Sequence, residues 1–325
     1  MFSYIVRKYK NVLELEGGYD KIKTICKIHG LCDFVTKIGV KNMDLSIVII
    51  NHNTRQLTKQ TVESILDTKP QFIYEIIVVD NSDKEEEQYK SDNPFVTVLG
   101  HIENKGFAHG CNIGAAIARG DYLLFLNSDT IMQKNTLDAS VLYMKQNSDV
   151  GGLGVQVVLA DGQLDHACRR GFPTPWNAFC YFAHIDRLFP NIPVFNGYRL
   201  GHLDRSKTYD VDAVTGAYLM MPAELYKKLG GFDETFFMYG EDLDLCWKIK
   251  AAGYRVVYYA PVTCVHLKGK SGRSSGNPLV QYHFYNAMLI FYERYYDKQY
   301  PRWLTGIIKW VIRSKMPKIE VASHD

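Results

Sequence analysis

The sequence predicts an α/β fold in which a single, mostly parallel central sheet is flanked by helices. Four runs of β-branched and apolar residues have the length of buried strands: Leu45–Ile50, Ile76–Val79, Val96–Leu99 and Tyr122–Leu126. Segments with helical spacing alternate with these runs. Continuous apolar strands that alternate with helices are typical of a parallel sheet covered on both faces.

The elements follow one another in three parts, 1–43, 44–277 and 278–325. Residues 1–43 are expected to form a basic helical extension, because they carry eight Lys or Arg against four acidic residues. The central part is expected to contain helices at Leu57–Leu66, Asn112–Arg119, Thr136–Gln146, Pro222–Leu229 and Leu243–Ala252. Two later strands are expected at Ala213–Met221 and Arg255–Tyr259, after a loop-rich insert at 160–210. From Pro278 onward the chain has the pattern of a C-terminal helical extension.

Composition limits the class of protein. The 325 residues are 46% hydrophobic and 22% charged, which suits a globular domain with a sizeable core, and the net charge of +3 is too small to indicate a nucleic-acid partner. The seven cysteines are scattered without a CxxC pair, so neither a disulfide framework nor a zinc site is expected. No run of 18 apolar residues is present, and a secretory leader is not expected, because no apolar stretch follows Arg7, Lys8 and Lys10. We therefore expect a cytoplasmic protein, either free or peripheral on the cytoplasmic face of the inner membrane.

Two common nucleotide-binding motifs are missing from the sequence. Gly106, Gly110 and Gly114 are four residues apart, so they do not form GxGxxG, and the first strand ends in Asn51-His52-Asn53 instead of a glycine turn. A Walker A loop is also missing. The sequence therefore argues against nicotinamide chemistry and against P-loop phosphate transfer.

Polar side chains follow three of the expected strands at the point where each strand ends. They are His52-Asn53, Asp80-Asn81 and Asn127-Ser128-Asp129. Asn, Asp and Ser also favour turns, so one such group alone would carry little meaning. Three groups at the carboxyl ends of strands favour a nucleotide or cofactor cleft, because open α/β sheets bind ligands there. Asp129 is suited to a hard divalent cation, which prefers oxygen ligands and commonly keeps phosphate oxygens in its shell.

An acidic segment near the C-terminal end of the central part is embedded in aromatic residues. Between Gly230 and Trp247, five carboxylates fall within twelve residues. A charge held against apolar surface is costly unless it is paired or used. An acidic helix start would explain Glu241 and Asp242 through the helix dipole, but it would not explain the surrounding Phe and Tyr. The segment therefore predicts part of an active site.

Five motifs of this chain together resemble a known family. A strand with a polar end is followed in order, between about Leu45 and Ser275, by IIVVDNS, NKGFAHGCNIG, LLFLNSD and GGFDETFFMYGEDLDLCWK. In order and spacing they are similar to the inverting family 2 glycosyltransferases of the GT-A fold, and most similar to the bacterial rhamnosyltransferase-like branch. The resemblance implies that residues 44–277 are a catalytic domain that uses a nucleotide-diphosphate sugar and Mg2+ or Mn2+. Residues 1–43 lie outside it.

The resemblance also implies roles on the donor side. Asp80 is expected to accept the N3–H of a uracil or thymine base. Asp129 occupies the last position of the family's DxD metal motif, and His266 matches a position that supplies a second metal ligand. The remaining nucleotide-sugar contacts are expected at Asn53, Asn104, Gly106, Asn112, Asn127, Lys268 and Arg273. The last two belong to the basic loop Lys268–Asn277, which either holds the diphosphate or is a solvated surface loop.

On the acceptor side, Asp242 matches the family's general base, which would deprotonate the attacking hydroxyl. Glu241 either orients the site or binds an acceptor hydroxyl, and Asp244 is interpreted as structural. The segment Arg169–Trp176 resembles an acceptor-side loop of the same branch. Its arginines either meet acceptor phosphate or brace the insert. The residues expected on this side are Arg169, Arg170, Trp176 and Gly216.

The last helix combines apolar and basic residues. Its apolar face contains Trp303, Leu304, Ile307, Ile308, Trp310, Val311 and Ile312, and basic residues complement it. Such a helix either lies in an anionic membrane interface or packs on protein. The leading hypothesis is an inverting transfer of a sugar, with rhamnose from dTDP-rhamnose as the best guess, to a polyprenyl-linked or polysaccharide acceptor in surface-glycan synthesis. Alternatives are a UDP-hexose or UDP-N-acetylhexosamine donor, and a non-enzymatic saccharide-binding or scaffold subunit.

Overall fold

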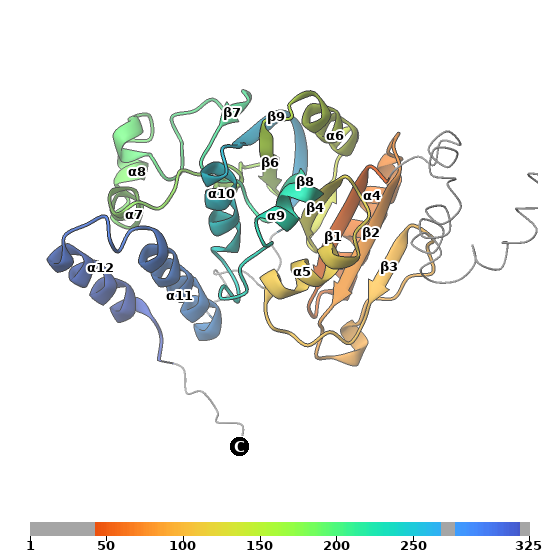
Figure 1. Cartoon of the computed structure of the whole chain (residues 1–325), viewed down its shortest axis with the longest axis horizontal. Helices are drawn as coiled ribbons and strands as arrows, with labels where there is room; N and C mark the ends of the chain where they lie inside the picture. Colours follow the sequence, from red (N-terminus) through yellow and green to blue (C-terminus); the bar gives the residue numbers. More distant parts are fainter. Residues whose placement is uncertain (1–42, 268–276, 319–325) are drawn as a thin grey trace, which may run out of the picture. The chain divides into compact units, whose positions relative to one another are not determined.

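The computed structural model describes residues 43–267 and 277–318, so the expected extension at 1–43 lies almost entirely outside the described residues (Figure 1). In the described part, one nine-stranded sheet has the order β3-β2-β1-β4-β8-β6-β9-β5, with β7 beside β9. Its strands are β1 (Leu45–Asn51), β2 (Tyr74–Asp80), β3 (Val96–Leu99), β4 (Tyr122–Asn127), β5 (Thr130–Met132), β6 (Val150–Leu159), β7 (Tyr209–Asp210), β8 (Tyr218–Pro222) and β9 (Arg255–His266).

The described residues form nine helices, some of which cover the two faces of this sheet (Figure 1). They are α4 (Arg55–Thr68), α5 (Phe107–Ile117), α6 (Thr136–Gln146), α7 (Pro175–Phe182), α8 (Ile185–Leu188), α9 (Ala223–Lys228), α10 (Glu241–Ala251), α11 (Pro278–Tyr295) and α12 (Arg302–Lys315). Short 3-10 turns lie at Glu85–Glu87, His166–Cys168 and Pro193–Phe195. The insert expected to be loop-rich therefore contains two short helices, α7 and α8.

The parallel half of the sheet brings the polar strand ends to one edge. β1 pairs in parallel with β2 and with β4, and the register sets Asn51 beside Asp80 and Ile50 beside Asn127. All seven residues of β1 are buried, as its uninterrupted apolar run predicts. The three polar groups read from the sequence thus lie at the carboxyl ends of adjacent strands.

The other half of the sheet is mixed, which differs from the expectation of a mostly parallel sheet. β8 runs antiparallel to both β4 and β6, while β5 and β7 run antiparallel to β9. The chain leaves the sheet at the end of β6, pairs with β9 through the two residues of β7, and then enters β8 in the direction opposite to β6. β9 joins the expected strand Arg255–Tyr259 with the apolar run Val262–Val265, which was also interpreted as a strand, and ends at His266 as a single twelve-residue strand.

Close packing of helices on the sheet positions the site. In α5, a Cβ on Gly114 would lie 2.5 Å from a methyl carbon of Val48, so a residue without a side chain lets this helix approach β1. In α10, Leu245, Cys246 and Ile249 are fully buried. The first turn of α10, which carries the acidic motif, is thereby fixed against the sheet.

The described residues from Met43 onward belong to one compact unit, so α11 and α12 pack on the central domain. Asp244 in α10 is fully buried, and it accepts hydrogen bonds from Arg294 and from the Tyr295 hydroxyl, each at 2.6 Å. These bonds tie the acidic motif to the end of α11, which agrees with the structural role inferred for Asp244. Among the described residues, no helix has both the length and the apolar character needed to cross a membrane.

Candidate active site

The acidic motif forms the first turn of α10. Gly240 precedes the helix with a φ of 83°, a conformation that favours glycine, and Glu241 and Asp242 follow as the first two helical residues. Only 7% of Glu241 and 8% of Asp242 is exposed. Carboxylates are favoured at a helix N-terminus by its dipole, but burial at this level also requires specific partners.

Asp242 has three such partners: the Leu243 amide donates to its Oδ1 at 2.8 Å, and two groups donate to its Oδ2. Its Oδ2 accepts a hydrogen bond from Arg170 Nη2 at 2.6 Å and another from the Gly216 amide at 3.1 Å. Burial by itself would lower the pKa of Arg170, but the charge of Asp242 and hydrogen bonds to Asp242 and Tyr198 raise it above its ordinary value. The guanidinium therefore stays charged and holds the Asp242 carboxylate in one orientation.

Glu241 differs from its neighbour because one of its oxygens is unsatisfied. Among the described residues, no group donates a hydrogen bond to its buried Oε2. Burial, followed by the charge of Asp242, raises the pKa of Glu241 well above its usual range. Two adjacent carboxyl groups thus have different environments, and one of them retains an unused hydrogen-bonding atom at the site.

Gly216 connects this carboxylate pair with the end of β4. A Cβ on Gly216 would lie 3.8 Å from Asp242 Cβ and 3.9 Å from Glu241 Oε1, so position 216 faces both acids. The next residue, Ala217, accepts a backbone hydrogen bond from Asn127 at 3.3 Å. The segment around Gly216 therefore joins the expected acceptor side to the expected metal motif.

The expected metal ligands meet on the other side of this segment. His266, at the end of β9, approaches Asp129 Oδ1 through Nε2 at 3.1 Å, while its Nδ1 approaches Asp165 Oδ2 at 3.1 Å. Burial works to lower the pKa of His266, but hydrogen bonds to Asp129 and Asp165 outweigh it and raise the pKa to about 9. A carboxylate behind the imidazole is the usual way to orient a histidine ligand.

The donor set at this position fits a hard divalent cation. Asp129 Oδ1 and His266 Nε2 point toward one another, so a cation between them would replace their contact with two metal bonds. Within residues 43–267 and 277–318, no group of three or more His, Cys, Asp or Glu is arranged to hold a metal. The part of the chain that the structure describes thus offers two ligands, and substrate phosphate oxygens and water would supply others.

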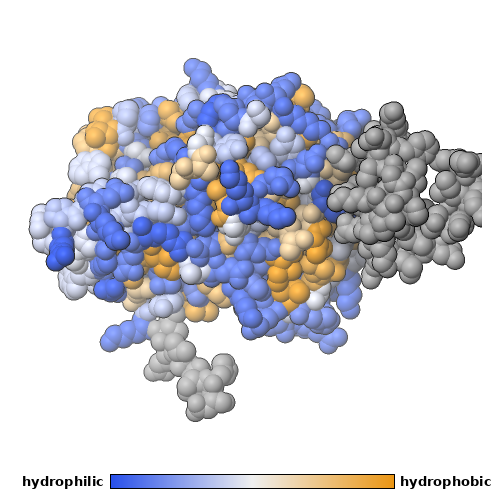
Figure 2. Space-filling view, viewed as in Figure 1, coloured by the Kyte–Doolittle hydropathy of each residue, from blue (hydrophilic) through white to orange (hydrophobic). Residues whose placement is uncertain are grey.

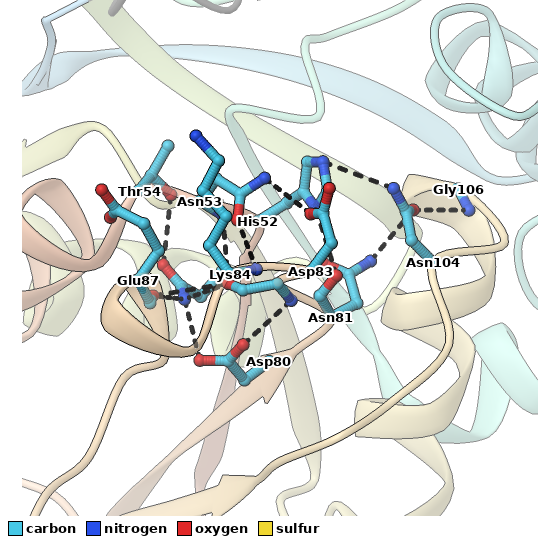
Figure 3. Close-up of polar contacts among 12 residues, drawn as sticks. His52, Asn53, Thr54, Asp80, Asn81, Asp83, Lys84, Glu87, Asn104 and Gly106 are labelled. Atoms are coloured by element: carbon cyan, nitrogen blue, oxygen red, sulfur yellow. Dashed lines mark hydrogen bonds and ion pairs between the residues drawn. The ribbon is translucent and has the colours of Figure 1, made fainter.

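The ends of β1 and β2 form a polar network (Figure 3). Asp80 is 1% exposed, and its carboxylate accepts hydrogen bonds from Asn51 Nδ2 at 2.8 Å and from the amides of Ser82 and Tyr89. Asp80 is thus occupied by protein groups, which differs from the expectation that it meets a nucleotide base. The neighbouring Asn81 is 4% exposed, and its Oδ1 has no hydrogen-bond partner among the residues that the structure describes.

Asn104 extends this network toward the loop before α5 (Figure 3). Its Oδ1 accepts hydrogen bonds from Asn81 Nδ2 at 3.3 Å and from the Gly106 amide at 3.2 Å. Gly106 has a φ of 103°, and a Cβ there would lie 2.3 Å from the carbonyl oxygen of Phe237. The donor-side loop therefore rests directly on the acidic motif, and only glycine allows this approach.

Two other donor-side candidates bind protein groups. The Asn112 amide donates to Phe232 O at 3.0 Å and to Glu234 Oε1 at 2.7 Å, so it holds the turn that leads into the acidic motif. Asn53 Nδ2 donates to Asp83 Oδ1 at 2.6 Å at the edge of the polar network. Asn112 therefore has a structural role in this arrangement, whereas the resemblance implied a nucleotide contact.

The acceptor-side candidates separate into different environments. The Arg169 guanidinium donates to the carbonyls of Leu203 and Asp204 at 2.8 and 3.0 Å, so it braces the insert. Trp176 is 46% exposed, and its indole N–H donates to Val194 O within the insert. Arg170 and Gly216 alone of the four expected residues contact Asp242. Lys268 and Arg273 lie outside the described residues.

Sequence reasoning missed two residues of this site. Asp165 does not follow an expected strand, because the turn after β6 was not predicted. The only sequence feature that could have indicated it is the polar pair Asp165-His166. Asn81 stood beside Asp80 in IIVVDNS, and the choice between them depended on which side chain the network occupies. The spacing of residues in the sequence alone identifies neither Asp165 as the partner of His266 nor Asn81 as the residue whose amide oxygen lacks a hydrogen-bond partner in the described part of the chain.

This architecture is the GT-A fold, which glycosyltransferases adopt. The mixed sheet carries polar groups at its strand ends, a candidate metal pair, and a buried carboxylate at the start of a helix. A solved structure of GalNAc-T7 with UDP, GalNAc and Mn2+ shares the fold, with a TM-score of 0.58, 18% identity, and coverage of 87% of this chain and 53% of the other. At that identity the likeness concerns the fold alone.

Sequence comparison gives the family. Residues 46–205 match glycosyl transferase family 2, and residues 203–268 match the family described as the N-terminal domain of galactosyltransferase. The chain therefore carries a family 2 glycosyltransferase domain, as its motifs predicted.

Three curated relatives are each about a quarter identical to this chain over the residues that align. The O-antigen biosynthesis protein RfbC of Myxococcus xanthus is 26% identical over 73% of this chain, a match that spans only 18% of RfbC. Rhamnosyltransferase WbbL of Escherichia coli is 25% identical, over 73% of this chain and 88% of WbbL. The N-acetylglucosaminyl-diphospho-decaprenol L-rhamnosyltransferase of Mycobacterium tuberculosis is 25% identical, over 60% of this chain and 61% of that protein.

Proposed function

We propose that this protein is an inverting glycosyltransferase that moves a sugar from a nucleotide-diphosphate donor to a hydroxyl of a saccharide acceptor in surface-glycan synthesis. The observation that carries the proposal is the buried Asp242 carboxylate, which Arg170 and Gly216 hold in one orientation at the start of α10. The relatives named for rhamnose transfer support dTDP-rhamnose as the donor. The relative named for a decaprenol-linked substrate supports a polyprenyl-linked acceptor.

Asp242 serves as the general base of the proposed reaction. Its carboxylate takes the proton of the acceptor hydroxyl while the hydroxyl oxygen bonds to C1 of the donor sugar. The bond between C1 and the diphosphate breaks with its electron pair on the phosphate oxygen, so the nucleoside diphosphate leaves and the anomeric centre inverts. Arg170 keeps the base oriented, because its guanidinium fixes one carboxylate oxygen.

Glu241 is assigned to the acceptor. Because burial raises its pKa, the side chain is suited to remain protonated and to donate a hydrogen bond from its unsatisfied oxygen to an acceptor hydroxyl. Gly216 faces the same two acids, so its missing side chain leaves room for that hydroxyl.

Asp129 and His266 are the residues that would hold Mg2+ or Mn2+, with Asp165 orienting the imidazole. When bound, the cation supplies positive charge that stabilises the leaving diphosphate. Asn127, whose Nδ2 lies 3.5 Å from His266 Nε2, is suited to orient this pair.

Base recognition is assigned to Asn81 in place of Asp80. A buried amide oxygen that has no hydrogen-bond partner among the described residues is suited to accept the N3–H of uracil or thymine, whereas the Asp80 carboxylate already accepts from three protein groups. Asn104 orients Asn81 through the hydrogen bond between their amides. Asn81→Ala should therefore weaken nucleotide binding without changing its metal dependence.

The proposal is tested by transfer assays with purified protein and a panel of nucleotide sugars. Transfer from dTDP-rhamnose is expected. If transfer occurred only from a UDP-hexose or a UDP-N-acetylhexosamine, that nucleotide sugar would be the donor instead. Asp242→Asn should reduce turnover at least about 1,000-fold, while calorimetric titration with UDP or dTDP in Mn2+ gives an affinity near that of the wild type. Near-normal turnover of the variant would remove Asp242 from the base role. Absence of binding to both nucleotides would favour a non-enzymatic subunit.

A further inference from the structure

Helix α12 has one face that packs on the protein. Thr305 and Ile312 are buried, and the Thr305 hydroxyl lies 3.0 Å from the Tyr292 hydroxyl of α11. Lys309 pairs with Glu293 at 3.2 Å and with Asp297 at 2.6 Å. This inner face accounts for the attachment of α12 to α11.

On another side of the same helix, apolar side chains remain exposed in the part of the chain that the structure describes. Trp303 is 68% exposed, Ile307 51%, Trp310 69% and Val311 43%. Their spacing of four, three and one residues sets them on one side of the helix, about 12 Å long at 1.5 Å per residue. We call these four residues the outer face of α12. Two tryptophans exposed to this degree do not contribute to the core, so the fold alone does not explain them.

The charged residues of α12 itself are all basic. Helix α12 contains no Asp or Glu, and Arg302, Arg313, Lys315 and Lys318 are exposed on or just after it. Arg313 is 58% exposed, even though its guanidinium lies 3.5 Å from Glu293. Tryptophan next to exposed basic residues is the combination by which a surface helix inserts into anionic lipid headgroups.

A second exposed apolar surface lies on the insert. It consists of Trp176, Phe179, Phe182, Leu188, Phe189, Ile192 and Val194, each between 39% and 73% exposed, and we call it the aromatic lobe. Trp176 packs against Phe179 and Phe195, with ring centroids 5.7 and 6.2 Å apart, so the lobe is held together by its own contacts. Figure 2 shows apolar atoms at the end of the molecule where Figure 1 draws α8.

Both surfaces are attached to α11. Phe172, which immediately precedes the lobe, packs against Phe291 of α11, with ring centroids 6.2 Å apart. Figure 1 shows α7 and α8 at the same end of the sheet as α11 and α12, opposite β3. Arg170, two residues before Phe172, is the partner of Asp242. A surface that holds this end of the molecule would therefore act within a few residues of Arg170, the partner of the proposed base.

We propose that the outer face of α12 and the aromatic lobe dock on the surface of an anionic lipid bilayer. The tryptophans and the lobe enter the headgroup region, and the basic residues of α12 pair with lipid phosphates. This inference rests on the proposed function and deepens it. A polyprenyl-linked acceptor would be presented at the surface of a bilayer, so docking there would bring the enzyme to its acceptor. The exposed cations argue for anionic lipid over a second copy of the chain, since two copies of the same basic face would repel.

The test uses the full chain and lipid vesicles without any substrate. Co-sedimentation with vesicles of phosphatidylcholine and phosphatidylglycerol should be strong, and it should weaken with phosphatidylcholine alone or at high salt. Trp303→Ser combined with Trp310→Ser should lower the partition coefficient about tenfold or more. Leu142→Ser, at a 56% exposed position on α6, is the matched control and should leave it unchanged.

Two further measurements keep the outcomes distinct. Circular dichroism of the double variant should match that of the wild type, because both tryptophans lie outside the core. Equal vesicle binding by the double variant and the wild type would overturn the proposal. So would a concentration-dependent dimer that the double variant abolishes, without vesicle binding by the wild type. Since the vesicle assay needs no donor or acceptor, its outcome is independent of whether sugar transfer is found.

Discussion

The ion pair between Arg170 and Asp242 gives the most direct prediction from this structure. The two side chains are each 11% exposed, and their charged atoms are 2.6 Å apart. Replacing Arg170 by Met leaves the Asp242 carboxylate buried without its counter-charge, which should cost about 3–5 kcal/mol of unfolding free energy. Asp242→Asn leaves Arg170 unpaired and should cost a similar amount.

The double variant distinguishes a true pair from two independent losses. When both charges are absent, no buried charge is left without a partner, so the double variant should be more stable than Arg170→Met alone. We expect a coupling energy of at least about 1.5 kcal/mol from the double-mutant cycle. The assay is urea unfolding followed by tryptophan fluorescence and circular dichroism, with unfolding free energies from linear extrapolation.

A matched control is available at the adjacent residue. The Arg169 guanidinium donates to two carbonyl oxygens and not to a carboxylate, so Arg169→Met and Asp242→Asn should be additive within about 0.5 kcal/mol. If the effects of Arg170→Met and Asp242→Asn were also additive, the ion pair would make no energetic contribution. The inference that Arg170 holds the Asp242 carboxylate in one orientation would then be refuted. Should Arg170→Met fail to fold alone, recovery of folding in the double variant would still show the coupling.

Three other changes test separate parts of the site. Asp244→Ala removes a fully buried carboxylate and should lower the thermal midpoint of unfolding by roughly 6–12 °C, which corresponds to about 3 kcal/mol. The folded variant should retain turnover, and a stable but inactive variant would contradict the structural role of Asp244. Gly106→Ala would bring a Cβ to 2.3 Å from the Phe237 carbonyl oxygen and should weaken both stability and nucleotide binding by about 1–3 kcal/mol; wild-type behaviour in calorimetry would show that the loop is not packed there. Asp165→Ala removes the carboxylate behind His266 and should lower Mn2+ affinity about 10–100-fold in nucleotide titrations, and an unchanged Mn2+ requirement would count against it.

Local pattern was sufficient for the parallel half of the sheet and for most helices. The expected helix Thr136–Gln146 is α6 with the same bounds, and the runs from Leu45 and Ile76 are β1 and β2. These elements are determined by periodicity and side-chain shape, which are properties of neighbouring residues. The antiparallel half was not anticipated, because strand direction depends on how the insert returns the chain to the sheet.

The sequence by itself determined the class of fold, the acidic motif at Asp242 and the candidate metal positions, because each is a short run of residues in a recognisable order. Only the tertiary structure decided which side chains serve them. Arg170 is 72 residues from Asp242 and Asp165 is 101 residues from His266, so no local spacing could pair them. The same holds for the two faces of α12, since a helix with apolar residues around much of its surface does not reveal which face the protein covers. Packing decides this, because only the folded chain sets which atoms water still reaches.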